Sequence, residues 1–198
     1  QRQMCIRDSS GSISAGKDSS PYIISTEKIY TGKPYASFTS LINYKGRFYC
    51  AFREAKKHYD PSGEDVGIIR ILYSKNGKRW QPFLTYSVDG IDLRDPKLTV
   101  TPEGKVMLLV EEVKYENKVA VLRKSCVSFF SSNKLHTELI PISFKPNMGW
   151  NWLWDVSWID GIAYGYIYAP YFAFVKSSDG INYKLCLLYT SPSPRDRG

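Results

Sequence analysis

The chain has 198 residues, of which 43% are hydrophobic and 15% aromatic, and a net charge of +8. This length suits one domain, the apolar content excludes global disorder, and no run of about 18 apolar residues suggests a membrane span. The 15 Tyr and nine Phe favour strands over helices. The basic residues are dispersed without a basic stripe, which argues against a nucleic-acid partner.

The two ends of the chain resemble translated sequencing adapters. Residues 1–8 read QRQMCIRD and residues 186–198 read CLLYTSPSPRDRG, and reverse-complementary DNA strings can encode parts of both. Such segments are kept out of fold reasoning. We therefore expect adapter sequence at both ends, a polar lead-in at 9–21, and a folded domain at 22–185.

Setting the ends aside leaves two cysteines inside the expected domain. They are Cys50 and Cys126. Two cysteines allow one disulfide at most and do not have the spacing of a metal site. Cys50 lies in an apolar strand pattern, so we expect a buried free thiol there. Neither a metal nor another cofactor is expected.

Strand-like segments fill the interior of the chain. They cover residues 36–44, 47–55, 67–74, 97–101, 105–113, 118–124, 153–159, 162–169 and 171–176. Turn signals such as Asn76-Gly77 and Asp160-Gly161 separate them. No segment has the pattern of a helix of three turns. The sequence therefore predicts an all-β protein.

Two features recur along the chain. The turn glycines Gly46, Gly104 and Gly161 are spaced by about 57 residues, and a strand follows each of them. The pattern Ser-x-Asn/Asp-Gly-x-x-aromatic occurs at residues 74–80 and 177–183, with a degenerate copy at 131–137. A repeat of this length with several short strands in each unit is typical of β-propeller blades.

The blade order predicts which loops share one end of the propeller. If strands 36–44, 47–55 and 67–74 form the first blade with a fourth strand from Trp80, the repeated turns lie at one end of the channel. The long polar loops 53–67, 89–96 and 145–155 then meet at the opposite end. Binding sites are often built from loops on a rigid scaffold, so we expect the site there.

Charged residues at the edges of these loops are the first candidates for the site. Arg53 and Glu54 end one strand, and Arg94 and Asp95 begin another. Arginine binds carboxylates through paired hydrogen bonds, and carboxylates transfer protons. The same residues would also suit a ring of salt bridges that braces the blades, and the sequence leaves both interpretations open.

The loop 53–67 holds further polar candidates. His58 is suited to acid–base chemistry or to donating a hydrogen bond to a substrate. Asp65 is a candidate proton donor or acceptor, whereas Asp60 and Glu64 equally suit a solvated loop.

The loop 145–155 contributes aromatic residues. The indole rings of Trp150, Trp152 and Trp154 offer flat faces for a sugar ring, although packing between blades is the alternative. Asp155 begins a strand that would face the channel. We select Trp152 and Asp155 as candidate substrate contacts.

Residues 48–80, 92–109, 152–165 and 172–185 resemble the sialidase-like β-propellers that carry Asp-box repeats, also called bacterial neuraminidase repeats. The resemblance covers residues 22–185. It implies a six-bladed propeller in the parent protein, with about half of the blades present here. It further implies a glycoside hydrolase that removes terminal acidic sugars from glycans, and a secreted or periplasmic parent.

The resemblance assigns roles to a few residues. Arg53 matches the first of three arginines that hold the sialic-acid carboxylate, and Asp60, Asp65 and Asp95 compete for the acid–base role. The remaining arginines and the Tyr–Glu nucleophile would lie beyond the chain, so we expect it to be inactive alone.

The catalytic candidates are therefore Arg53, Asp65 and Asp95, and the substrate-binding candidates are Arg53, Glu54, His58, Arg94, Trp152 and Asp155. Asp155 stands where a cation is expected, which places the sialic substrate in doubt. A glycosidase with a different substrate and a non-catalytic carbohydrate-binding propeller are the alternatives.

Overall fold

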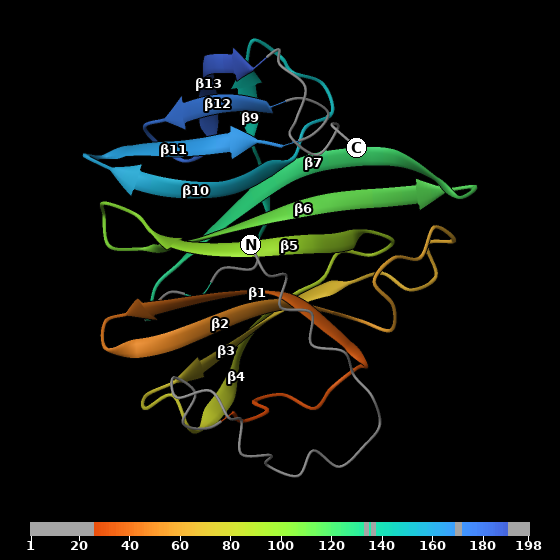
Figure 1. Ribbon diagram of the computed structural model, residues 1–198, viewed down its shortest axis with the longest axis vertical. Helices are drawn as coiled ribbons and strands as arrows, with labels where there is room; N and C mark the ends of the chain where they lie inside the picture. Colours follow the sequence, from red (N-terminus) through yellow and green to blue (C-terminus); the bar gives the residue numbers. More distant parts are fainter. Residues whose placement is uncertain (1–25, 133–134, 136–137, 169–171, 190–198) are drawn as a thin grey trace, which may run out of the picture.

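The computed structural model describes residues 26–132, 135, 138–168 and 172–189, and these residues form strands and loops (Figure 1). The strands are β1 Tyr35–Tyr44, β2 Arg47–Ala55, β3 Ile68–Ser74, β4 Trp80–Tyr86, β5 Asp92–Val100, β6 Val106–Glu116, β7 Val119–Phe130, β8 Ile140–Pro141, β9 Ser143–Lys145, β10 Leu153–Ile159, β11 Ile162–Ile167, β12 Phe172–Ser177 and β13 Asn182–Tyr189. None of the described residues forms a helix long and apolar enough to cross a membrane.

The strands form three sheets that correspond to successive blades. Their orders are β1-β2-β3-β4, β5-β6-β7-β8 and β10-β11-β12-β13-β9. Consecutive strands pair antiparallel, whereas β9 pairs parallel with β13 at the outer edge of the third sheet. The predicted all-β propeller with about half of its blades is confirmed.

The first strand of each sheet is the inner strand of its blade. β1 and β10 both contact β5, and the arrows of the three strands point the same way in Figure 1. The starts of these strands therefore lie at one end of the molecule, and the turns that end them lie at the other.

Apolar side chains fill the two spaces between the sheets. Tyr49 and Ile71 of the first sheet pack with Leu108 and Phe130 of the second. A second core lies between the second and third sheets and includes Met107, Leu109, Val156, Val175 and Tyr183. Successive residues of β6 belong to different cores because side chains alternate across a strand. This pattern explains why almost all of β6 is buried.

The repeated turns fold as their composition predicts. The Asn76 carboxamide oxygen accepts hydrogen bonds from the backbone N–H groups of Lys78 and Arg79, at 3.0 Å each. The Asp179 carboxylate does the same for Ile181 and Asn182, at 2.8 Å each. The glycine after each polar residue has a positive φ, which glycine adopts without steric cost.

Each inner strand contains a bulge near its start. The irregularities lie between Ser37 and Ser40 in β1, between Arg94 and Lys97 in β5, and between Leu153 and Asp155 in β10. A bulge changes the direction of a side chain and increases the local twist. The three strands therefore share an irregularity at the end where the site is expected.

Several expectations about the ends fall outside the described residues. They are the adapter-like segment 1–8, the lead-in 9–21, most of the degenerate repeat at 131–137, and residues 190–198. Strand β13 continues to Tyr189, past the domain end expected at Leu185. The adapter-like segment contributes Leu187 and Leu188 to this strand, and such apolar residues extend a strand readily whatever their origin.

Candidate functional site

The Asp92 carboxylate at the start of β5 connects the first two blades. Its Oδ1 atom accepts hydrogen bonds from Arg53 Nη2 at 2.7 Å, from Arg53 Nε at 3.1 Å and from the Gly67 N–H at 2.7 Å. Its Oδ2 atom accepts one from Arg94 Nη1 at 3.1 Å. All of these groups are buried, so the loops 53–67 and 89–96 meet as expected.

The guanidinium of Arg53 donates to a protein group from each of its nitrogen atoms. Besides Asp92, it donates through Nη1 to the Lys57 carbonyl oxygen at 3.0 Å, and its side chain has no exposed surface. A Cβ atom added at Gly67 would lie 2.3 Å from Arg53 Nε, so glycine is required beside it. This geometry favours the bracing role that the sequence left open for Arg53.

Asp95 lies in the bulge of β5 with a positive φ of 46°. It is 8% exposed, and its Oδ1 atom has no hydrogen-bond partner among the described residues. Burial raises the pKa of this carboxyl, although the nearby cations Arg94 and Lys97 act to lower it. A buried carboxyl with a raised pKa holds its proton more readily than a free one, and acid–base catalysis uses this property.

Arg94 and His58 lie beside Asp95. Arg94 Nη2 donates to the His58 carbonyl oxygen at 3.3 Å, and the Arg94 Nε atom has no partner among the described residues. His58 Nδ1 shares a hydrogen bond with the Tyr35 hydroxyl. Burial, together with the charges of Arg94 and Arg53, lowers the pKa of His58, which favours the neutral imidazole at neutral pH.

Other predicted site residues lie apart from this group. Glu54 accepts hydrogen bonds from Arg70 Nη2 at 2.6 Å and from the Lys33 N–H at 3.1 Å. Asp65 binds the backbone N–H groups of Lys56 and Lys57, at 2.8–3.1 Å, and so fixes the loop. Both carboxylates are held by protein donors, which is the arrangement of structural residues.

The two remaining acidic residues of the loop 53–67 are peripheral. Asp60 accepts hydrogen bonds from the N–H and hydroxyl of Ser62, as solvated turns commonly do. Glu64 is exposed. Of the three aspartates expected to compete for the acid–base role, Asp95 is the one with a buried oxygen that has no hydrogen-bond partner among the described residues.

Among the tryptophans of the loop 145–155, Trp154 contacts Lys97 of β5. The Lys97 ammonium lies 5.0 Å from the centroid of its ring, and Tyr168 packs against it at 5.4 Å. Trp152, the tryptophan selected from the sequence, is half-buried, and its indole N–H has no partner among the described residues. Asp155 is exposed and accepts a hydrogen bond from the Val156 N–H.

Sequence reasoning missed Glu111 on β6, which lies opposite Arg94 in the sheet. Burial raises its pKa well above the ordinary value, and the charge of Asp95 acts in the same direction. The available signal was a pair of acidic residues, Glu111 and Glu112, inside the apolar run of residues 106–113. A carboxyl inside such a run is costly to bury and is therefore informative.

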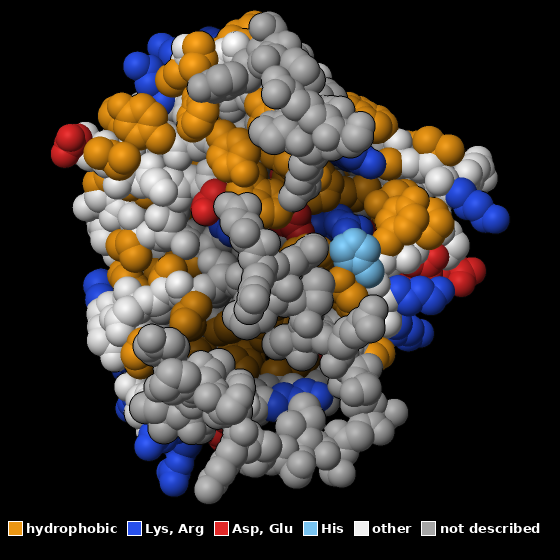
Figure 2. Space-filling view, viewed as in Figure 1, with side chains coloured by type: hydrophobic (Ala, Val, Ile, Leu, Met, Phe, Trp, Pro, Cys, Tyr) orange, Lys and Arg blue, Asp and Glu red, His pale blue; other side chains and the backbone are white. Residues whose placement is uncertain are grey.

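Figure 2 shows histidine, basic and acidic side chains gathered among hydrophobic ones near the middle of the face that Figure 1 presents. Within the described ranges, no group of three or more His, Cys, Asp or Glu is arranged to hold a metal ion.

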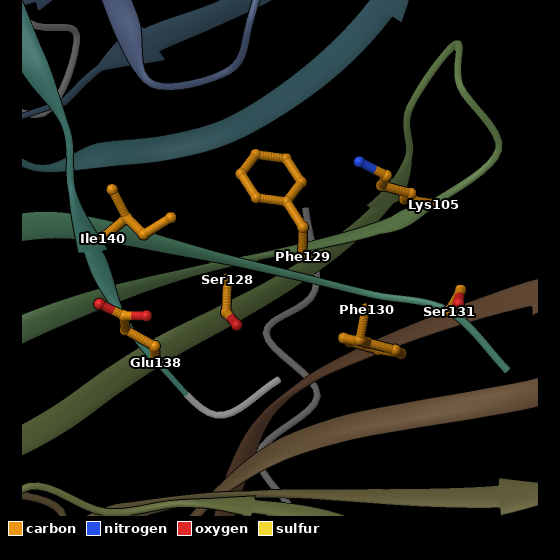
Figure 3. A pocket seen from close by; sticks show the side chains of 7 residues that line it. All are labelled: Lys105, Ser128, Phe129, Phe130, Ser131, Glu138 and Ile140. Atoms are coloured by element: carbon orange, nitrogen blue, oxygen red, sulfur yellow. The ribbon is translucent and has the colours of Figure 1, made fainter. Parts of the chain in front are cut away.

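A separate pocket lies beside β7 (Figure 3). Its lining includes Lys105 from the turn before β6 and Ser131, just after the end of β7, so the pocket lies at the opposite end of the second blade from Asp95. The described residues that line it are Lys105, Ser128, Phe129, Phe130, Ser131, Glu138 and Ile140. Its described lining holds a single carboxyl, that of Glu138, so the group around Asp95 is the stronger candidate for chemistry.

No family model and no curated protein matches the chain. Solved structures do match its fold. A protein of unknown function from Dyadobacter fermentans has 19% identity and a TM-score of 0.60, over 80% of this chain and 56% of its own. A xylan β-1,4-xylosidase from Bacillus halodurans has 16% identity and a TM-score of 0.56, over 79% and 31%. A family 117 glycoside hydrolase from Zobellia galactanivorans has 14% identity and a TM-score of 0.53, over 85% and 50%.

These matches define the class of fold. The matched structures include five-bladed propeller glycoside hydrolases, and nothing in them is specific to sialidases. The chain spans about half the length of the first structures that it matches. Because the identities are low, the likeness establishes the propeller fold alone. The six blades expected from the sialidase resemblance find no support in these matches.

Proposed function

We propose that the chain is part of a propeller glycoside hydrolase that acts on a glycan other than a sialoside, with Asp95 as its acid–base carboxyl. The observation that carries this proposal is the buried carboxyl of Asp95, turned by a bulge at the start of an inner strand. Its raised pKa and its unpartnered oxygen suit a group that exchanges a proton with a substrate.

The occupied guanidinium of Arg53 argues against a sialic substrate. Gripping a sugar carboxylate requires N–H donors that the substrate can reach, whereas the Arg53 side chain has no exposed surface and its three nitrogen atoms already bind Asp92 and Lys57. The exposed Asp155 adds a negative charge where a carboxylate substrate would need a positive one. A neutral sugar is therefore the better fit to this half of the site.

The remaining predicted residues have supporting roles in this proposal. Arg94 and His58 orient the substrate beside Asp95, because Arg94 retains an unpartnered Nε donor and the imidazole of His58 is exposed. The ring of Trp154, next to Lys97, provides a stacking face in place of Trp152. The opposite half of the site, including a second carboxyl, would come from the blades that complete the propeller.

The test compares hydrolysis of nitrophenyl pentosides, hexosides and a sialoside by the protein with its complete propeller. We expect turnover of a neutral glycoside and none of the sialoside. Asp95→Asn should reduce kcat by about 10²–10⁴-fold, the usual contribution of a general acid or base. Asp60→Asn makes the same change at the periphery of the loop and should retain activity.

Three results would count against the proposal. Turnover of the sialoside would support a sialidase instead. An Asp95→Asn variant with unchanged activity would exclude Asp95 as the acid–base carboxyl. Glycan binding without any turnover would favour the non-catalytic carbohydrate-binding alternative.

A further inference from the structure

Glu111 is a buried carboxyl that the proposed chemistry does not use. It lies on β6, and only 1% of its surface is exposed. Its Oε1 atom accepts a hydrogen bond from the Ser125 hydroxyl at 2.5 Å. Its Oε2 atom has no partner within the part of the chain that the structure describes. An ionised carboxylate in this position would leave a charged oxygen buried without a donor, which is costly.

The charges around Glu111 disfavour its ionisation. The negative charge of Asp95, on the neighbouring strand β5, raises the pKa of Glu111, and so does the negative charge of Glu112 on the same strand as Glu111. The ammonium of Lys124, on β7, is taken up by Glu112 at 3.0 Å. The thiol of Cys126 on the same strand is also buried. Burial, followed by the charge of Glu112, raises its pKa, so the thiol stays neutral.

Two hydrogen-bond donors act to lower the pKa of Glu111. The Ser125 hydroxyl and the backbone N–H of Leu153 both favour the charged form of Glu111. The Leu153 N–H also donates to Ser125 Oγ at 3.0 Å, which links Glu111 through Ser125 to the start of β10. Burial remains the largest influence, and it acts in the opposite direction.

Asp95 has a different set of neighbours. Burial raises the pKa of Asp95 too, but the cationic groups of Arg94, Lys97 and Arg53 act against this and favour its charged form. When two nearby carboxyls compete, the one with cationic neighbours ionises first, and its charge then holds the proton on the other.

We infer that Asp95 and Glu111 form a coupled carboxyl pair in which Glu111 keeps its proton at neutral pH while Asp95 carries the charge. Glu111 is thus a positioning residue: by remaining neutral, it allows a charged Asp95 to exist in a buried site. The inference rests on the proposed function only for the catalytic role of the Asp95 charge. The order in which the two carboxyls ionise does not depend on a substrate.

Infrared spectroscopy of the full chain tests this order, because a protonated carboxyl has a C=O band distinct from that of a carboxylate. At neutral pH we expect one buried protonated carboxyl in the wild-type protein and its loss in Glu111→Gln. Glu112→Gln is the matched control, since it removes the adjacent carboxyl, and it should keep the band. Asp95→Asn should lower the pH at which the band titrates by about one unit or more.

The inference is overturned if the wild-type band is absent at neutral pH, if it survives Glu111→Gln, or if Asp95→Asn leaves its titration unchanged. Should Asp95→Asn fail to fold, Ser125→Ala replaces it. That variant removes a donor to the charged form, so the band should persist to higher pH, and an unmoved titration would again overturn the inference. Glycoside turnover is measured separately, so its absence would count against the hydrolase proposal and leave the order of ionisation standing.

Discussion

Arg53 on β2 and Asp92 at the start of β5 form a buried ion pair, with Arg53 Nη2 2.7 Å from Asp92 Oδ1. The pair joins two blades, and Arg94 binds the second oxygen of the same carboxylate. Two arginines on one carboxylate fix the orientation of the loops around Asp95. The ion pair therefore supports the site through geometry, without contact between Arg53 and a substrate.

Breaking this pair from one side should be costly. Arg53→Met is expected to lower the free energy of unfolding by about 3–5 kcal/mol, because Asp92 is then left buried with a single cationic partner. Urea denaturation followed by tryptophan fluorescence measures the change. The double variant Arg53→Met/Asp92→Leu should recover part of the loss, since it removes the uncompensated charge as well. A single variant as stable as the wild type would refute the bracing role.

The repeated turn at Asp179 should make stability depend on pH. Burial acts to raise the pKa of this carboxyl, but hydrogen bonds from Asn182, Ile181 and Ser177 prevail and lower it. A carboxyl whose pKa is lowered by folding stabilises the fold at pH values above its ordinary pKa of about 3.8. This stabilisation is lost as the pH falls towards the pKa of the carboxyl in the folded state. Urea midpoints at about pH 6 and pH 3 should therefore differ more for the wild type than for Asp179→Asn. Equal pH dependence in both proteins would exclude this origin.

The strands and turns were predictable because their signals are local. Strand-like segments marked β1, β2 and β10, and the polar–glycine turns at Asn76 and Asp179 fixed the hairpins. The end of the molecule that holds Asp95 also followed from the order of strands within a blade.

The details of the site depended on contacts that no local pattern encodes. The sequence could not decide between substrate binding and bracing for Arg53, because its partner Asp92 lies 39 residues away. The choice between Trp152 and Trp154 depends on the bulge between Leu153 and Asp155, which shifts the alternation of side chains along β10. Glu111 was missed because its relation to Asp95 depends on the register between β5 and β6.

The cysteines provide a chemical test of the packing. Cys50 and Cys126 are buried, and burial raises the pKa of the Cys50 thiol to about 11. Since the thiolate is the reactive form, both should resist alkylation by iodoacetamide in the folded chain. Cys186 is exposed and should react quickly, which makes it the internal control. Peptide mapping by mass spectrometry reads out each site, and equal labelling of Cys50 and Cys186 without denaturant would contradict the packing of the first sheet.

The free face of the first sheet should drive self-association of this chain. Leu41 on β1 is 61% exposed and lies beside a hollow lined by Ile29, Tyr30, Cys50 and Phe52, among others. The matched structures are about twice as long, so further blades would cover such a face in a complete propeller.

Leu41→Lys should therefore shift the chain towards monomer in analytical ultracentrifugation, because the charge interrupts the apolar face. Val119→Lys is the matched control: Val119 is 62% exposed but lies at the start of β7, beside the turn from β6. It should leave the association unchanged. If the wild-type chain sediments as a monomer and unfolds cooperatively, the three blades are stable without further blades on this apolar face.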